Sequence, residues 1–421
     1  MSTPRVVITG IGLVTSLGRT LDEFGERLFA GETAVGPLEG WEIADERYRI
    51  GGQIKDFDIE RELPQGDTKR LLRYSQFALV AADRAINDAA LPLGELAPGR
   101  IGTSFGTAAG SLGEAVQTEI KRYLARGDRG ISPMAWVELT PCACSTHVAI
   151  RYNLQGPIST HSSGCVSGID TIAWGVQQIR KNLSDVMIVG GTDTPFFPFM
   201  WAIMTRSGIL ATAPEDGRGI PRPFSIDHNG IVLGEGGSAL VLESEAHARL
   251  RGARVYGEVL GVANAEEARP ITDLDETGHA FAVTMRKTLD DAGLPPTEID
   301  WVCAHGTGYP VADVSESRGI EAALGSHAFS VPVSSIRGAV GQSFASGAGY
   351  QVAAACLAIR HQRVPATLNF SQPAVGCRLD YVPNVSRVAR VRRVMINAAG
   401  VGGTHGGLVL SAYGNGRPPK G

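Results

Sequence analysis

Hydrophobic residues along the chain form two alternating patterns. Short apolar runs that end at glycines, at residues 5–12, 101–107 and 185–192, predict buried strands. Between them, apolar residues recur at helical spacing and predict helices, which we place at residues 21–30, 73–90, 114–126 and 137–152. Strands that alternate with helices in this way indicate a layered α/β fold with parallel or mixed sheets.

The same alternation begins again near residue 255. It predicts further strands and helices, in the order strand 255–262, helix 277–292, strand 301–304, helix 314–324, helix 348–361 and a final strand at 394–398. This echo predicts an internal duplication, with a first half at residues 1–250 and a second half at 251–421. The polar residues 40–68 are expected to form a surface insertion.

Composition and charge exclude several classes of protein. The 421 residues are 43% hydrophobic and 19% charged, which is typical of an ordinary globular chain. A net charge of −4 gives no general reason to bind nucleic acid or an anionic membrane. No apolar run is long enough to span a bilayer, and the six scattered cysteines do not resemble a disulfide framework. We therefore expect a cytoplasmic protein.

Other conspicuous residues have ordinary interpretations. Cys142 and Cys144 lack a second pair at metal-ligand spacing, so we interpret them as packing residues and expect no metal site. His147 and His161 are interpreted as structural histidines. The aromatic run at residues 196–201, FFPFMW, is interpreted as core, with an apolar tunnel or a subunit interface as the alternatives.

One cysteine has a more specific setting. Residues 156–170 read GPISTHSSGCVSGID, and apolar residues at helical spacing follow. Cys165 therefore lies where a strand-like segment turns into a helix, and the free N–H groups and dipole of a helix start stabilise a thiolate. The hypothesis is a nucleophile with a lowered pKa; the alternative is a small buried hydrophobe.

Seven motifs in order decide between these two interpretations. They are VVITGIG, SSGCVSG, RPF…NGIVLGEGG, AHGTG, SSIRGAVGQ, CRLDYVPN and GVGGTHGG. With them the chain resembles, almost end to end, the β-ketoacyl-acyl-carrier-protein synthases, including the ketosynthase and chain-length-factor subunits of type II polyketide systems. The resemblance implies the thiolase-like fold, in which two similar βαβ-rich halves stack mixed sheets around central helices.

The resemblance also implies a chemistry and a set of residues. Cys165 would take an acyl group from a carrier protein as a thioester, and the decarboxylated malonyl unit of a second carrier would attack it. The implied oxyanion hole consists of the backbone N–H groups of Cys165 and Val401. The other implied site residues are His305 and Gln342 as donors, Arg337, Asp313 and Glu316 as supporting groups, and Thr307, Tyr309 and Phe224 toward the pantetheine arm and substrate.

Several of these residues depart from the family pattern. Gln342 stands where the second histidine is normal, Arg337 replaces a lysine, Tyr309 replaces a threonine, and Val401 replaces a gating phenylalanine. An amide can donate a hydrogen bond to an enolate oxygen but cannot transfer a proton as imidazole does. Arginine is planar and forked and is no silent replacement for lysine.

Three functions remain open at this point. The first is a condensing enzyme with an altered Cys165–His305–Gln342 set. The second is a partner subunit like a chain-length factor, with little activity of its own. The third is an acyltransferase that loads Cys165 without decarboxylating malonyl carrier protein. All three imply a homodimer or heterodimer and no cofactor beyond the phosphopantetheine of an acyl carrier protein, whose docking patch we predict at Lys69, Arg70, Arg73, Arg129 and Arg206.

Overall fold

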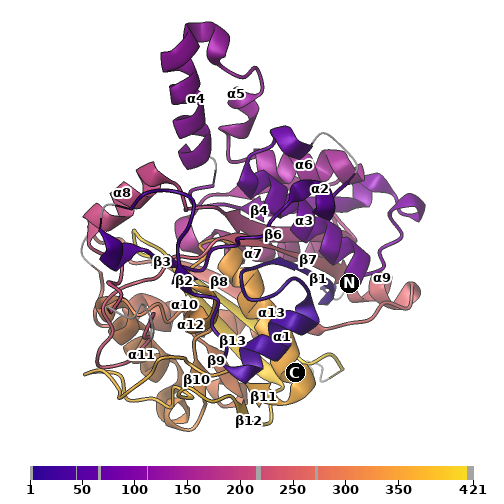
Figure 1. Ribbon diagram of the computed structural model, residues 1–421. Helices are drawn as coiled ribbons and strands as arrows, with labels where there is room; N and C mark the ends of the chain where they lie inside the picture. Colours follow the sequence, from indigo (N-terminus) through magenta and orange to yellow (C-terminus); the bar gives the residue numbers. More distant parts are fainter. Residues whose placement is uncertain are drawn as a thin grey trace.

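The computed structural model describes residues 3–43, 45–64, 68–110, 112–214, 220–270 and 274–414. Its main feature is a ten-stranded mixed sheet, built from two sets of five strands (Figure 1). The first set comprises β1 (Val6–Val14), β4 (Ile101–Gly106), β5 (Ile158–His161), β6 (Val186–Asp193) and β7 (Gly236–Ser244). The second comprises β8 (Gly257–Glu266), β9 (Trp301–Cys303), β10 (Val333–Ser334), β13 (Arg393–Ala399) and β14 (Thr404–Ser411).

The two sets have the same topology. The order is β5-β4-β6-β7-β1 in the first and β10-β9-β13-β14-β8 in the second, so each follows the sequence order 3-2-4-5-1. The directions also agree: β4 and β9 each pair in parallel with both neighbours, and the other pairs within each set are antiparallel. The internal duplication predicted from the alternating pattern is therefore present in the strand order.

The two sets are joined at one edge by a short stretch of pairing. Residues 6–8 of β1 pair with β7 on one side and with β8 on the other, in register Val6↔Val259 to Ile8↔Gly257. The hydrogen-bond ladder is thus continuous between the halves. Beyond this short stretch β1 pairs with β7 alone, so the two sets diverge and helices fill the space between them.

Two buried helices form the middle layer. α7 (Ser167–Arg180) and α13 (Ser346–His361) contact strands of both sets and each other. On the outer faces, α3 (Arg73–Asp88) and α6 (Ala143–Tyr152) cover the first set, while α10 (His279–Ala292) covers the second and α11 (Pro310–Leu324) packs on α10. The central helices implied by the family resemblance are confirmed.

The remaining elements are short or peripheral. They are α1 (Leu21–Ala30), α2 (Ile59–Glu62), α4 (Leu112–Arg126), α5 (Ala135–Glu138), α8 (Pro198–Ser207), α9 (Glu245–Leu250), α12 (Arg337–Val340), β2 (Gly36–Pro37), β3 (Ile50–Gly51), β11 (Arg363–Val364), β12 (Arg387–Val388) and eight 3-10 turns. α4 and α5 form a hairpin that projects from the body at the top of Figure 1. None of the helices in the described ranges is both long and apolar enough to cross a membrane.

Two expectations from the pattern were wrong in detail, whereas the aromatic run at 196–201 is partly core as expected, with Phe197 and Trp201 buried. The helix expected at residues 137–152 is split into α5 and α6, because Pro141 lacks the N–H that a continuous helix needs at this point. Residues 394–398 do not form the final strand, since β14 follows the glycine turn. The aromatic run at 196–201 begins helix α8, whose proline lies in the first turn where it is tolerated.

The close packing of α7 on α13 leads to a prediction. A Cβ added at Gly168 would overlap the carbonyl oxygen of Ala345. We expect Gly168→Ala to lower the free energy of unfolding by about 1–3 kcal/mol, since backbone rather than a flexible side chain must move. The measurement is the urea midpoint at unchanged m-value. Gly94→Ala, which meets nothing within 4 Å, is the matched control, and equal midpoints for both variants would contradict the argument.

Candidate active site

Cys165 lies at the start of the central helix α7. Strand β5 ends at His161, a 3-10 turn covers Gly164–Val166, and α7 begins at Ser167. Gly164 has φ +65, which favours glycine and lets the chain reverse directly before the cysteine. The Oγ of Ser167 accepts from the backbone N–H of Ser163 at 2.9 Å and holds the turn closed. The strand-to-helix position predicted for Cys165 is confirmed.

The glycine loop between β13 and β14 lies against this turn. A Cβ placed on Gly400 would lie 3.5 Å from the backbone nitrogen of Cys165. Thr404, at the other end of the loop, points its hydroxyl at the carbonyl of Ser163 at 3.5 Å. Val401 follows Gly400 and is exposed, at 67% of its surface. The structure therefore brings together the two backbone segments expected to supply the oxyanion hole.

The donors expected beside Cys165 come from the second half. Gln342 is buried, its backbone N–H donates to the carbonyl of Val232 at 2.7 Å, and its side chain acts on Cys165 in the sense that lowers the pKa of the thiol. His305 is also buried, and its Nδ1 has no hydrogen-bond partner. Burial, with the positive charge of Arg337 and the neighbouring His405, holds the pKa of His305 well below its ordinary value. The imidazole is therefore neutral at physiological pH.

The pKa of Cys165 departs from the expectation in direction. Burial raises the pKa of this thiol to about 11, although Arg337 and Gln342 act in the opposite sense. Desolvation disfavours the charged thiolate and here exceeds the stabilisation by the helix start and the nearby cation. Cys165 is thus a thiol at neutral pH, and a base has to take its proton before it can act as a nucleophile.

Arg337 is a buried cation with an unusual set of partners. The side chain is 2% exposed, and its Nε and Nη2 donate to the carbonyl oxygens of His305 and Gln351, each at 3.4 Å. Nη1 has no partner and lies against Gly347, where any Cβ would overlap it. Within the described ranges the guanidinium therefore faces amide carbonyls and no paired carboxylate, and burial lowers its pKa.

Gln351 is a buried polar residue beside Arg337 that the sequence interpretation missed. It lies fully buried on α13, and its Nε2 donates to the carbonyls of Ala304 at 3.1 Å and Asn397 at 3.0 Å, with a longer contact to Cys303. It therefore ties the ends of β9 and β13 together beside Arg337. The only sequence signal was a lone glutamine in the apolar pattern of 348–361.

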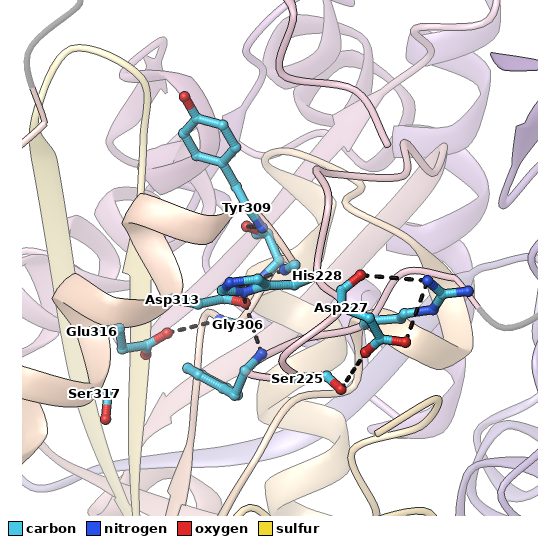
Figure 2. A network of polar contacts seen from close by, with 12 residues as sticks. Ser225, Asp227, His228, Gly306, Tyr309, Asp313, Glu316 and Ser317 are labelled. Carbon is cyan, nitrogen blue, oxygen red and sulfur yellow. Dashed lines mark hydrogen bonds and ion pairs between the residues drawn. The ribbon is translucent and has the colours of Figure 1, made fainter. Parts of the chain in front are cut away.

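Two buried carboxylates on α11 hold the HGTG turn. Glu316 accepts the backbone N–H groups of His305 and Gly306, each at 2.8 Å, and burial raises its pKa to about 7. Asp313 accepts the N–H of Phe224 at 2.7 Å and lies 3.1 Å from Nδ1 of His228. Figure 2 shows Asp313 between His228 and the turn that carries Gly306 and Tyr309. Both carboxylates therefore position backbone, as expected of supporting groups.

The residues expected to face the pantetheine arm lie at different depths. Tyr309 begins α11, is half-buried, and its ring points away from the two carboxylates (Figure 2). The Oγ1 of Thr307 accepts the N–H of Tyr309 at 3.4 Å. Phe224 is fully buried at φ +60 and stacks on Tyr381 with ring centroids 4.5 Å apart. Its side chain thus belongs to the core of the second half, beneath the turn.

The basic residues predicted as a docking patch do not form one set. Arg73 pairs with the buried Glu235 at 3.0 Å and packs over Phe77, so its charge is already engaged. Arg129 and Arg206 are exposed. Arg70 is exposed and makes an interaction of its own, and the side chain of Lys69 lies outside the described part of the structure.

Of the cysteines and histidines interpreted as structural, Cys144, His147 and His161 have structural surroundings, whereas Cys142 does not pack in the core. Cys144 is buried, and its sulfur donates to the carbonyl of Pro141 at 3.1 Å, whereas Cys142 is exposed. His147 is hydrogen-bonded to the buried Glu138 at the base of the projecting hairpin. His161 packs against Trp174.

Comparison with known proteins agrees with this geometry. Residues 3–248 match the family described as Beta-ketoacyl synthase, N-terminal domain, and residues 256–371 match Beta-ketoacyl synthase, C-terminal domain. The chain belongs to the β-ketoacyl synthase family. The fold is that of the thiolase-like ketosynthases.

The similar relatives include both fatty acid and polyketide enzymes. The chain is 34% identical to 3-oxoacyl-[acyl-carrier-protein] synthase 2 of Synechocystis over 97% of this chain and 98% of the relative. It is 37% identical to the granaticin polyketide putative beta-ketoacyl synthase 1 of Streptomyces violaceoruber, over the same shares. Among solved structures, the ishigamide ketosynthase/chain length factor superposes with a TM-score of 0.91 at 30% identity, covering 98% of this chain and all of that chain.

The raised pKa of Cys165 gives a pH prediction. Thiolate is the reactive species, so the rate of alkylation by iodoacetamide should rise about tenfold per pH unit from pH 7 to pH 10 without a plateau. Mass spectrometry of the Cys165 peptide measures this rate, in a Cys142→Ser background because Cys142 is exposed.

The same experiment tests the part played by Arg337. Arg337→Gln removes a positive charge that lowers the pKa of the Cys165 thiol. Alkylation of Cys165 at pH 8–9 should therefore be slower in this variant than in the parent protein. Arg337→Lys keeps the charge and should slow it less. A plateau below pH 9 in the parent protein would show that the thiolate is stabilised more strongly than its burial allows.

Proposed function

We propose that this protein is a condensing acyltransferase of the 3-oxoacyl-[acyl-carrier-protein] synthase type. The observation that carries the proposal is the set of groups around Cys165. The side chain of Gln342 lies close enough to the cysteine to lower the pKa of its thiol, and the loop at Gly400 lies against the backbone nitrogen of Cys165. A nucleophile, an oxyanion loop and a neutral donor pair are what acyl loading and carbanion attack need.

The first half-reaction follows from these groups. A carrier-bound acyl thioester is the substrate, delivered on a phosphopantetheine arm that would enter past Tyr309 and Val401. The Cys165 thiol gives up its proton, its sulfur forms a bond to the acyl carbon, and the carrier sulfur leaves as a thiol. The neutral imidazole of His305 can accept a proton, which an imidazolium could not do.

The second half-reaction depends on Gln342 and His305. When malonyl carrier protein loses carbon dioxide, negative charge develops on its thioester oxygen, and the amide of Gln342 with the N–H of His305 would stabilise it. The carbanion then attacks the acyl carbon and releases Cys165. One well-placed donor at a developing oxyanion contributes about 3 kcal/mol, or roughly a hundredfold in rate.

A second candidate is a partner subunit like a chain-length factor. It is favoured by the same replacements, Gln342 for a histidine and Arg337 for a lysine, because neither transfers protons. Two similar proteins bear on it: a tetracenomycin ketoacyl synthase alpha subunit from Streptomyces glaucescens is 35% identical, and the ishigamide structure pairs a ketosynthase with a chain length factor. The retained Cys165 favours the enzyme.

Either function is expected to need a second subunit. The projecting hairpin exposes large apolar side chains, namely Ile120, Tyr123, Leu124, Met134 and Trp136, of which Leu124 and Trp136 are 78% and 72% exposed. Apolar surface of this size on one segment marks an interaction site. We infer a homodimer or heterodimer through this hairpin. An acyl carrier protein, like the one bound to the ketosynthase in a solved type II structure with a TM-score of 0.90, would deliver the substrate.

Gln342 separates the two candidates. If the chain is a condensing enzyme, wild type should release carbon dioxide from malonyl carrier protein and form β-ketoacyl product slowly. Gln342→Ala should then lower the condensation rate by up to about a hundredfold while leaving acyl loading on Cys165 nearly intact. Radiolabelled carbon dioxide release and intact-protein mass spectrometry measure the two steps. Gln155→Ala, at an exposed glutamine, is the matched control.

Two outcomes would reject the enzyme. The first is a wild type that loads acyl groups yet never releases carbon dioxide at high malonyl carrier protein. The second is activity that appears only with a complete synthase and survives Cys165→Ala in this chain, which would establish the partner subunit.

A further inference from the structure

An aromatic set lies in the same hydrophobic cluster as Cys165. Trp41, Phe196 and Trp201 contact one another, with ring centroids 5.9–6.3 Å apart. The cluster also contains Met204 and Phe344, and Cys165 packs against it. A chain attached to Cys165 and extending into this cluster therefore approaches these three rings.

Both indoles of the set carry an unused donor. The Nε1 atoms of Trp41 and Trp201 are buried, and neither has a hydrogen-bond partner within the described ranges. Trp201 is 4% exposed. Buried indole N–H groups usually find an acceptor, because leaving one unpaired costs free energy. The two indole rings contact each other and lie in the same cluster as Cys165. Their unpaired N–H groups therefore point to a hydrogen-bond acceptor on the chain that Cys165 carries.

Phe196 also lines a cavity. It has a volume of about 450 Å³, and Phe196 belongs both to its wall and to the aromatic set. The rest of the wall is mostly polar, with Gln53, Lys55, Arg73, Glu114 and Glu235 among its residues. Thr194 also lines it; this residue is 4% exposed, and its hydroxyl has no partner. Arg73 and Glu235 are already paired with each other, whereas a saturated hydrocarbon would leave the hydroxyl of Thr194 unsatisfied.

From these contacts we propose that the acyl chain carried by Cys165 bears oxygen in its distal part, as keto or hydroxyl groups, rather than being a saturated fatty acyl chain. The inference rests on the proposed function, since it assumes that Cys165 is acylated. Carbonyl oxygens along the chain accept from the indole N–H groups of Trp41 and Trp201, and a longer chain reaches the hydroxyl of Thr194. The aromatic rings pack on the carbon atoms between the oxygens.

The test compares matched chains. The probes are octanoyl and dodecanoyl thioesters of N-acetylcysteamine, each with and without one ketone in its distal half, and mass spectrometry follows acylation of Cys165. Wild type should acylate about three- to tenfold faster with the ketone of each pair, the effect of one net hydrogen bond. Trp201→Phe and Trp41→Phe remove the donors and should bring this ratio toward one.

Two further variants distinguish the loss of a hydrogen-bond donor from a change in packing around the aromatic set. Phe196→Leu disturbs the aromatic set without removing an N–H, so it should change the rates for both chains of a pair and leave their ratio. Thr194→Val keeps the side-chain shape and should lower the ratio for the dodecanoyl pair. This variant tests the inference if a tryptophan variant does not fold.

The outcomes distinguish the inference from the function on which it rests. Acylation that depends on Cys165 but does not discriminate between the chains of a pair would overturn the inference and leave the proposed function standing. So would a ratio that falls equally in Phe196→Leu. No Cys165-dependent acylation from any thioester, including one carried by an acyl carrier protein, would reject the proposed function itself.

Discussion

The close approach of α7 and α13 is the constraint on which the site depends. Gly168 on α7 and Gly191 on β6 both lie against the backbone at Ala345, with no room for a Cβ. This contact packs the start of α7 against the second half of the chain. Cys165 lies three residues before Gly168, so the same contact sets its height relative to Gln342 and the Gly400 loop. A nucleophile from one half thus meets donors from the other through backbone packing.

The positive charge in this site is not paired with a carboxylate of the described residues. Arg337 is a buried cation that faces the carbonyls of His305 and Gln351. Its charge lowers the pKa of both Cys165 and His305, but burial decides each result: the thiol stays protonated and the imidazole stays neutral. Burial likewise raises the pKa of Glu316 to about 7. Arg337 therefore places a positive charge beside a neutral thiol and a neutral imidazole, and a fixed positive charge stabilises negative charge that develops nearby.

The two halves share one strand order but contribute different residues to the site. Both halves keep the 3-2-4-5-1 strand order, yet the first supplies Cys165 and the second supplies His305, Arg337, Gln342 and the glycine loop. The projecting hairpin of α4 and α5 and the aromatic set around Trp201 both belong to the first half. The exposed apolar hairpin and most of the aromatic cluster thus lie on the half that carries Cys165.

The sequence by itself determined the elements that depend on local pattern. Alternating apolar runs gave the α/β class and the repeat, and the residues around Cys165 gave its place before α7, because period and turn chemistry are local. The motifs identified Gln342, His305 and the loop at Val401 as one site. The tertiary structure alone decided the rest. Strands β1 and β8 pair and join the two strand sets. Arg73 forms an ion pair with Glu235, and Gln351 accepts a hydrogen bond from Arg337. The tertiary structure also raised the pKa of Cys165, since desolvation depends on everything packed around the sulfur and not on its neighbours in sequence.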